Sequence, residues 1–205
     1  DYGEYNLLIL EHLATRRGPF GAAVSLDELL PFWRRRLSSP EWGAWRCTMT
    51  KQTLQQVGAG VPSSQLGGQS NAMAMRSAAA VAAFPALSGA ADAARTLMFT
   101  HRSEEALSGG EFFTRVAWKV ARLGERPRDA IDAAAAEMSP WIQQQVAKGV
   151  AKFQEATDPS SALSKEEFVD DLARHRGPPF VLYAAPGLRA TNLGPIIILC
   201  TISVM

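Results

Sequence analysis

The chain has 205 residues, of which 47 % are hydrophobic and 20 % are charged, and its formal net charge is +1. These values are ordinary for a globular protein, so the chain is long enough to bury a sizeable core. A net charge this small gives no electrostatic basis for binding nucleic acid or an acidic membrane surface. The cysteines, Cys47 and Cys200, match neither a disulfide framework nor a metal-ligand spacing, so a cytoplasmic protein is the default expectation.

The first third of the chain shows apolar residues at helical intervals. A helix is predicted over residues 4–16. Ser25-Leu26-Asp27-Glu28 has the pattern of a capping box, in which the Ser and Glu side chains accept free backbone N–H groups, and it predicts the start of a second helix. Residues 41–57 predict a third helix, whose two tryptophans we expect in the core. Four glycines and a proline within residues 58–68 predict a loop.

Small residues dominate the middle of the chain. Alanine is the main residue over 71–99, with a break at 85–89, so two closely packed helices are expected at the centre of a helical bundle. Residues 103–123 have a clear apolar face and predict another helix that stops at Gly124.

Farther along the chain, two prolines stand at natural helix starts, Pro127 and Pro140. A second capping box at residues 164–167 predicts one more helix, which ends at residues 177–179. No alternation of strands and helices occurs, so the predicted class is all-α, a compact multi-helix bundle.

Residues 180–205 abandon helical spacing and include an apolar run over 195–200. This run is too short to span a bilayer, which needs about 20 residues. Two interpretations stay open: a C-terminal strand packed on the bundle, or a foreign end produced by truncation, frameshift or alternative splicing. The predicted division is therefore a helical domain over 1–179 and an apolar, non-helical tail over 180–205.

The most informative stretch is Ser70-Asn71-Ala72-Met73-Ala74-Met75-Arg76, directly after Gly67, Gly68 and Gln69. A Gly- and Ser-rich turn opens there into a helix rich in Ala and Met. The first N–H groups of a helix are unpaired and carry the positive end of its dipole, which suits an anion such as phosphate. The pattern alone predicts a buried helix.

This stretch resembles the Gly-Asn-Gly-Ala-Ala-Met-Arg signature of the ADP-ribosylglycohydrolase family, which also includes jellyfish crystallins. The residues that agree with the signature are Asn71, Ala74, Met75 and Arg76. Ser70 and Ala72 stand where the family usually has glycine, and Met73 stands where it usually has Ala or Gly. The segment from Phe99 to Ala106 resembles a second family feature, a Thr-His pair that opens a helix rich in small residues. The resemblance implies the family's all-α fold and an ADP-ribose cleft lined by Gly67, Gly68, Ser70, Asn71, Arg76, Thr100 and His101.

Three of these residues have two interpretations each. Asn71 offers a donor and an acceptor that can bridge a ribose hydroxyl or a phosphate oxygen, or it is an ordinary residue at a helix start. Arg76 pairs with a phosphate or, as we favour, braces a carboxylate of a neighbouring helix. His101 contacts the ligand or caps the following helix, and Thr100 before it favours the ligand.

The resemblance also implies two magnesium ions, held in the family by a Thr-Asp-Asp-Thr motif near the N-terminus and an Asp-x-Asp-Thr motif near the C-terminus. Such a metal pair requires several converging carboxylates. Asp1 matches one aspartate as a metal ligand, but Tyr2 and Gly3 replace the other Asp and the Thr. No Asp-x-Asp-Thr follows Arg174, and Asp170-Asp171 is predicted on a solvated helix face.

The sequence therefore predicts an ADP-ribosylglycohydrolase-like protein whose partner is ADP-ribose or an ADP-ribosylated substrate. In the family the activity is magnesium-dependent hydrolysis of ADP-ribosyl N- or O-glycosidic bonds. Because its metal motifs are degenerate or missing, the chain is expected to be inactive or to be part of an active enzyme. Its start at Asp1 also predicts a fragment, a processed chain or an incomplete gene model. Two alternatives remain: a non-enzymatic, crystallin-like structural or ligand-binding protein of the same fold, and an unrelated helical interaction domain.

Overall fold

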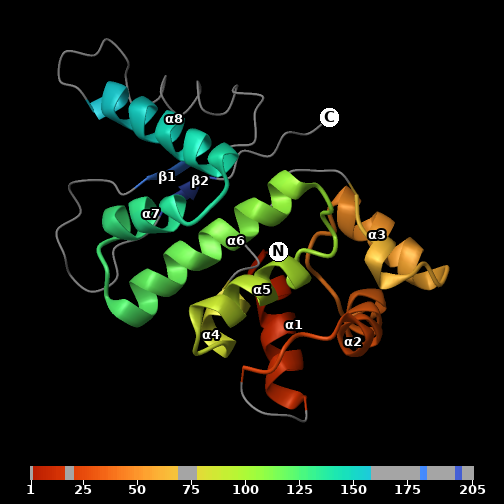
Figure 1. Ribbon diagram of the computed structural model, residues 1–205. Helices are drawn as coiled ribbons and strands as arrows, with labels where there is room; N and C mark the ends of the chain where they lie inside the picture. The colour runs from red at the N-terminus through yellow and green to blue at the C-terminus, as the bar shows by residue number, and fades with distance from the viewer. Residues whose placement is uncertain (1, 17–20, 69–77, 158–180, 184–196, 200–205) are drawn as a thin grey trace. The chain divides into compact units, whose positions relative to one another are not determined.

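A computed structural model of the protein describes residues 2–16, 21–68, 78–157, 181–183 and 197–199. These residues are mostly helical, so the predicted all-α class is confirmed (Figure 1). The chain divides into two compact units, Asp1–Glu125 and Arg126–Met205. The division into residues 1–179 and 180–205 stays a prediction.

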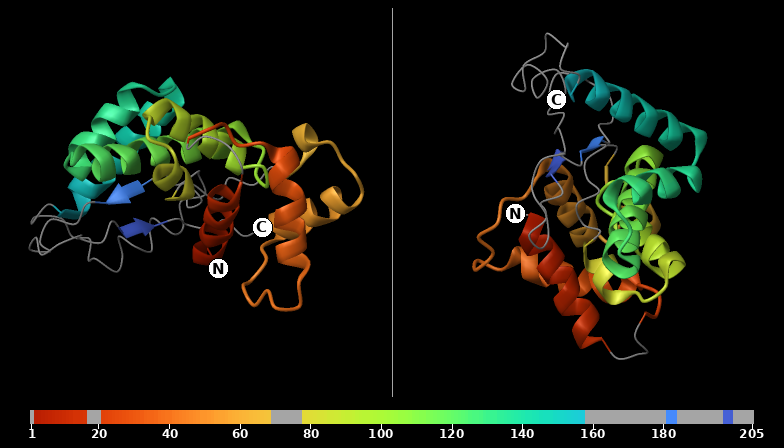
Figure 2. Two further views of the ribbon diagram at one scale, coloured as in Figure 1. Left: turned by 90° about the horizontal axis from the view of Figure 1, so that it is seen from below. Right: turned by 90° about the vertical axis from the view of Figure 1, so that its left-hand side faces the viewer.

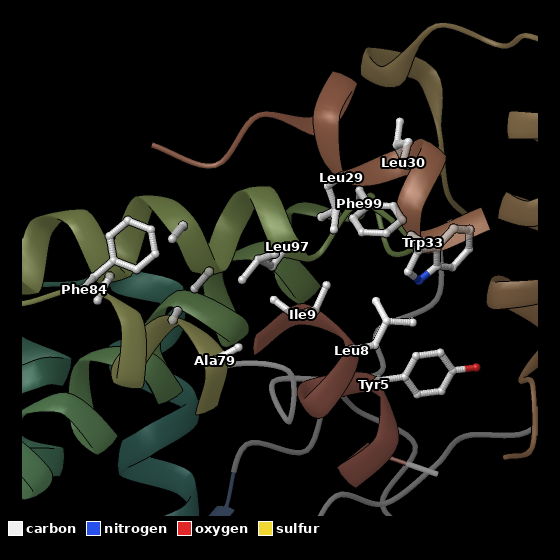
Figure 3. Close-up of a cluster of buried hydrophobic side chains, with 14 of the residues drawn as sticks. Tyr5, Leu8, Ile9, Leu29, Leu30, Trp33, Ala79, Phe84, Leu97 and Phe99 are labelled. Carbon is white, nitrogen blue, oxygen red and sulfur yellow. The ribbon is translucent and has the colours of Figure 1, made fainter. Parts of the chain in front are cut away.

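The first unit opens with α1 (Tyr2–Thr15) and α2 (Leu26–Ser38), close to the predicted bounds. Ser25 is the N-cap residue of α2 as predicted, but its side chain makes no capping hydrogen bond. The two helices pack against each other. Their buried side chains form a cluster with Phe99, shown in Figure 3: Tyr5, Leu8, Ile9, Leu29, Leu30 and Trp33.

The next helix, α3 (Thr48–Gly58), lies beside α2 (Figure 2) and is shorter than predicted. The prediction of a helix over 41–57 is wrong for residues 41–47. There the Arg46 Nε donates to the carbonyl oxygen of Leu37 at 3.0 Å, so the chain turns back onto the end of α2. Trp45 lies in this turn and is 59 % exposed, so its predicted place in the core is also wrong. The predicted loop after α3 is confirmed and contains a short 3₁₀ turn, η1 (Ser63–Gln65).

The described part of the first unit also contains α4 (Ala78–Ala83), α5 (Leu87–Leu97) and α6 (Glu104–Trp118). The predicted break between the two alanine-rich helices is confirmed. α5 lies along α6 (Figure 1), and the buried residues of α5 are four alanines and one leucine. Helix axes can approach closely where the side chains between them are small. α6 runs into a π-helical turn, Lys119–Leu123, and stops at the predicted Gly124, whose φ of 69° is the left-handed conformation typical of a helix end.

The second unit contains α7 (Pro127–Ala136) and α8 (Pro140–Thr157), which begin at the two predicted prolines and pack against each other. Short strands β1 (Val181–Tyr183) and β2 (Ile197–Leu199) pair antiparallel, with Leu182 opposite Ile198. The predicted helix that starts at the capping box of residues 164–167 lies outside the described residues. Within the described part of the chain, no helix combines the length and apolar character needed to cross a membrane.

Candidate binding site

The structure brings the Gly67–Gly68 turn into backbone contact with Thr100 and His101. Gly68 and His101 form a parallel β-bridge. The Gly68 N–H donates to the carbonyl oxygen of Thr100 at 3.3 Å, and the Arg102 N–H donates to the carbonyl oxygen of Gly68 at 2.7 Å. Two segments assigned to the site from separate motifs are therefore neighbours. We call them, together with Phe99 and Arg102, the glycine–histidine junction.

Gly67 has a conformation that only glycine adopts without strain at this position. Its φ is 86°, and a Cβ atom placed there would lie 2.6 Å from the carbonyl oxygen of Phe99 and 2.9 Å from the carbonyl carbon of Thr100. A left-handed backbone already costs an L-residue roughly 1–2 kcal/mol. The obstructing atoms belong to the backbone, so no side-chain rotation relieves the contact. The close approach of the two segments therefore requires glycine.

Helix α3 covers the turn from another direction. The Gly67 N–H donates to Oε1 of Gln56 at 2.8 Å. A Cβ atom on Gly68 would collide with Sδ of Met49 and would lie 3.1 Å from Oε1 of Gln52. Three side chains of one helix thus lie close to the glycine backbone.

Thr100 and His101 are both buried, with exposed fractions of 0 % and 2 %. Oγ1 of Thr100 and Nδ1 of His101 are 2.8 Å apart, so a hydrogen bond between them fixes the orientation of the imidazole ring. The capping interpretation of His101 is wrong, because the N-cap residue of α6 is Ser103, whose Oγ accepts from the Ala106 N–H at 3.1 Å. The ligand role of His101 stays a prediction.

The junction is attached to the hydrophobic core through Phe99. This ring lies against Trp33 in Figure 3, with centroids 5.1 Å apart and an edge-to-face arrangement. Trp33 is 1 % exposed and belongs to α2. The contact between Phe99 and Trp33 therefore holds one side of the junction against the hydrophobic core, in addition to the hydrogen bonds.

Glu104 is the first carboxylate that follows the junction in the sequence, two residues after Arg102. Burial raises its pKa, but hydrogen bonds from Arg95 and Ser108 and the charge of Arg95 outweigh this and leave the pKa below its ordinary value. Nη2 of Arg95 lies 2.9 Å from Oε1 of Glu104. This carboxylate is therefore ionised at neutral pH and engaged by a cation, which does not suit a general acid.

The described residues do not fit a two-magnesium centre. Among them, no group of three or more His, Cys, Asp or Glu side chains is arranged to hold a metal ion. Tyr2 and Gly3, which stand at the family's metal motif, belong to α1. Asp1, Ser70, Asn71, Arg76 and Asp170-Asp171 lie outside the described residues, so their roles stay predictions.

Sequence reasoning missed two polar residues at the junction, Gln56 and Arg102. Arg102 is exposed, and its Nη1 donates to the carbonyl oxygen of Gln65 at 2.8 Å. Its position directly after the Thr-His pair could have drawn attention to it. Gln56 carries no comparable signal, because a glutamine in the last turn of a helix is commonplace.

An all-α chain that joins a glycine turn to a Thr-His pair has the features expected of an ADP-ribosylglycohydrolase-like protein. A family model described as ADP-ribosylglycohydrolase matches residues 1–199. The chain therefore belongs to the ADP-ribosylglycohydrolase family, whose members are generally metal-dependent hydrolases that act on ADP-ribosylated substrates. Comparisons with curated proteins and with solved structures gave no match.

Proposed function

We propose that this chain binds an ADP-ribosyl group at the glycine–histidine junction and the Ser70–Arg76 segment, and that this binding does not require magnesium. The observation that carries the proposal is the bridge between His101 of the Thr-His pair and Gly68, which stands two residues before the Ser70–Arg76 segment in the sequence. The family's general action on ADP-ribosylated substrates supports the same ligand class.

The chemistry of the junction suits an anionic ligand. Its described residues, from Gly67 to Gly68 and from Phe99 to Arg102, include no carboxylate. Two adjacent glycines, both buried, let the turn pack closely against the Thr-His pair and α3. A diphosphate bound here would meet no opposing negative charge from these residues.

Each predicted residue has a role in this proposal. Asn71 bridges a ribose hydroxyl or a phosphate oxygen, and Arg76 pairs with phosphate or braces a neighbouring carboxylate. The His101 ring is oriented by Thr100, and the His101 backbone is bridged to Gly68. The polar groups thus come from one continuous segment and one buried pair.

We also propose that the chain lacks the family's hydrolase activity. The residues that match the N-terminal metal motif supply one carboxylate, Asp1, because Tyr2 and Gly3 replace an Asp and a Thr. Several converging oxygen ligands are needed to hold a pair of magnesium ions. Magnesium, where bound in the family, positions water and stabilises charge near the anomeric carbon.

Calorimetric titration with ADP-ribose, with and without magnesium, tests both parts. We expect the same dissociation constant in the two titrations and no release of ADP-ribose from an ADP-ribosylated peptide. Absence of binding at millimolar ADP-ribose would overturn the binding proposal. Magnesium-dependent release of ADP-ribose would overturn the proposed inactivity.

The substitution Asn71→Ala sharpens the assignment. Loss of its hydrogen bonds to the ligand should weaken binding about tenfold, equivalent to about 1.4 kcal/mol. The thermal midpoint should stay close to that of the unchanged protein. Ser64→Ala, in the exposed part of the preceding loop, is the matched control and should bind normally. Equal affinities of the two variants would remove Asn71 from the site.

A further inference from the structure

The Gly67–Gly68 turn depends on anchors beyond its backbone bridge. That bridge supplies two hydrogen bonds, which both involve Gly68. The N–H of Gly67, the residue with the left-handed backbone, bonds instead to a side chain. Because the Ser70–Arg76 segment follows this turn closely, any freedom in the turn changes where that segment begins.

Gln56 fixes the turn from the side of α3. Its Oε1 accepts from the Gly67 N–H at 2.8 Å, across 11 residues of chain. Its backbone carbonyl oxygen accepts from the Val61 N–H at 3.0 Å. One residue of α3 therefore binds the loop near its start and again at the glycine turn.

Arg102 fixes the turn from the side of the Thr-His pair. Its N–H donates to the carbonyl oxygen of Gly68 at 2.7 Å, and its Nη1 donates to the carbonyl oxygen of Gln65 at 2.8 Å, across 37 residues of chain. The backbone bond survives a change of side chain, whereas the guanidinium bond does not. The contribution of the side chain can therefore be tested separately.

We infer that Gln56 and Arg102 are positioning residues of the ADP-ribosyl site, an inference that rests on the function proposed above. They act through the Gly67–Gly68 turn and do not contact the ligand. Gln56 fixes the N–H of the left-handed glycine, and Arg102 fixes the carbonyl oxygens on both sides of it. Together they fix the Gly67–Gly68 turn, the part of the site that the structure describes on this side of His101.

The first test removes the acceptor of Gln56 and then restores it. Gln56→Met keeps the length and helix preference of the side chain but cannot accept from Gly67. Gln56→Glu keeps an oxygen at the same distance along the side chain. We expect the Met variant to bind ADP-ribose about fivefold to tenfold more weakly, a typical effect of one lost hydrogen bond that leaves its donor unpaired. The Glu variant should bind near normally at about 0.5 M salt, which screens its added charge.

Two further measurements separate positioning from general loss of structure. Gln55→Met, at the exposed neighbouring position of α3, is the matched control and should bind normally. Amide exchange followed by NMR should show faster exchange at Gly67 in Gln56→Met and restored protection in Gln56→Glu. A purely structural role would lower the thermal midpoint of Gln56→Met without this local pattern.

Arg102→Met tests the second positioning residue. We expect about threefold to fivefold weaker binding, with the same salt dependence as the unchanged protein, because the lost bond is internal. A shallower salt dependence would show that Arg102 contacts the phosphates directly and would overturn its positioning role.

The outcomes separate this inference from the proposed function. If the unchanged protein does not bind ADP-ribose at millimolar concentration, both fail. If it binds, and Gln56→Met binds equally well although its Gly67 amide is unprotected, the inference fails and the proposed function stands. If Gln56→Met does not fold, Arg102→Met decides, and normal affinity in that variant overturns the inference.

Discussion

Part of the glycine–histidine junction, Phe99 to Arg102, connects α5 to α6, yet the junction and the α5–α6 helix pair are stabilised in different ways. The helix pair depends on volume: a Cβ atom on Gly110 of α6 would already lie 3.0 Å from Cγ of Met98. The structure of the junction depends on the geometry of a few hydrogen bonds and on the left-handed backbone of Gly67. Changes in the helix pair should therefore alter stability alone, whereas changes in the junction should alter ligand binding as well.

The largest expected effect is that of Gly67→Ala. The added methyl group meets the Phe99 carbonyl oxygen at 2.6 Å, and the residue must also keep a φ of 86° or give it up. Backbone strain and the collision together should lower the free energy of unfolding by about 3 kcal/mol or more. Urea denaturation measures this loss, and calorimetry should show that ADP-ribose binding is lost in the molecules that remain folded.

Gly60→Ala is the matched control for this substitution. Gly60 also has a positive φ, 74°, but nothing lies within 4 Å of its added Cβ atom. It should lose only the conformational part, about 1 kcal/mol, and bind ADP-ribose normally. Similar losses in the two variants would show that the close approach at Gly67 is not what defines the junction.

An intermediate effect is expected from Ala90→Leu in the helix pair. Ala90 is fully buried in α5, so three extra carbon atoms overpack the contact and should lower the free energy of unfolding by about 1–3 kcal/mol. The folded variant should bind ADP-ribose with unchanged affinity. Ser88→Leu, at an exposed position of the same helix, should stay within about 0.5 kcal/mol of the unchanged protein. Weakened binding by Ala90→Leu would mean that the two regions are coupled.

The same contrast explains how much of the fold the sequence predicted. Helix ends marked by local chemistry were predicted well, as at Gly124, Pro127 and Pro140. The helix expected over 41–57 was wrong at its start because its limit is tertiary. Arg46 donates to the Leu37 carbonyl oxygen at the end of another helix, and no local pattern records that bond.

The residues of the candidate site also differ in whether a local sequence pattern predicts them. Glycines and a Thr-His pair form a recognisable pattern, and the structure brings Gly68 and His101 into contact. Gln56 could not be found in this way, because its side chain accepts from a backbone N–H that is distant in sequence. Arg102 stands beside the Thr-His pair, but no pattern shows that its guanidinium bonds to the distant Gln65 carbonyl oxygen. Side chains that bond to distant backbone have no characteristic spacing.

The smallest predicted effect is a dependence of stability on pH that originates in His12, outside both regions. His12 of α1 is buried, and its ring lies 5.4 Å from the Phe32 ring of α2. Burial lowers its pKa, the charge of Arg16 lowers it further, and Glu28 acts in the opposite direction. The unfolded chain, in which the pKa is about 6.5, therefore binds the proton more readily than the folded chain. Acidification below this value should reduce stability until the pH falls through the lower, folded pKa.

His12→Phe isolates this contribution because it keeps an aromatic ring against Phe32 but does not titrate. Urea denaturation between pH 7.5 and 5 should show a smaller loss of stability in the variant than in the unchanged protein, since all other titrating groups are common to both. Equal losses would mean that burial of His12 does not oppose its protonation.

Because α1 and α2 supply Leu8 and Trp33 to the cluster that contains Phe99, the same variant also tests whether a change in this cluster alters the junction. If the two regions are independent, the difference in ADP-ribose affinity between the two folded proteins should stay constant over the same pH range.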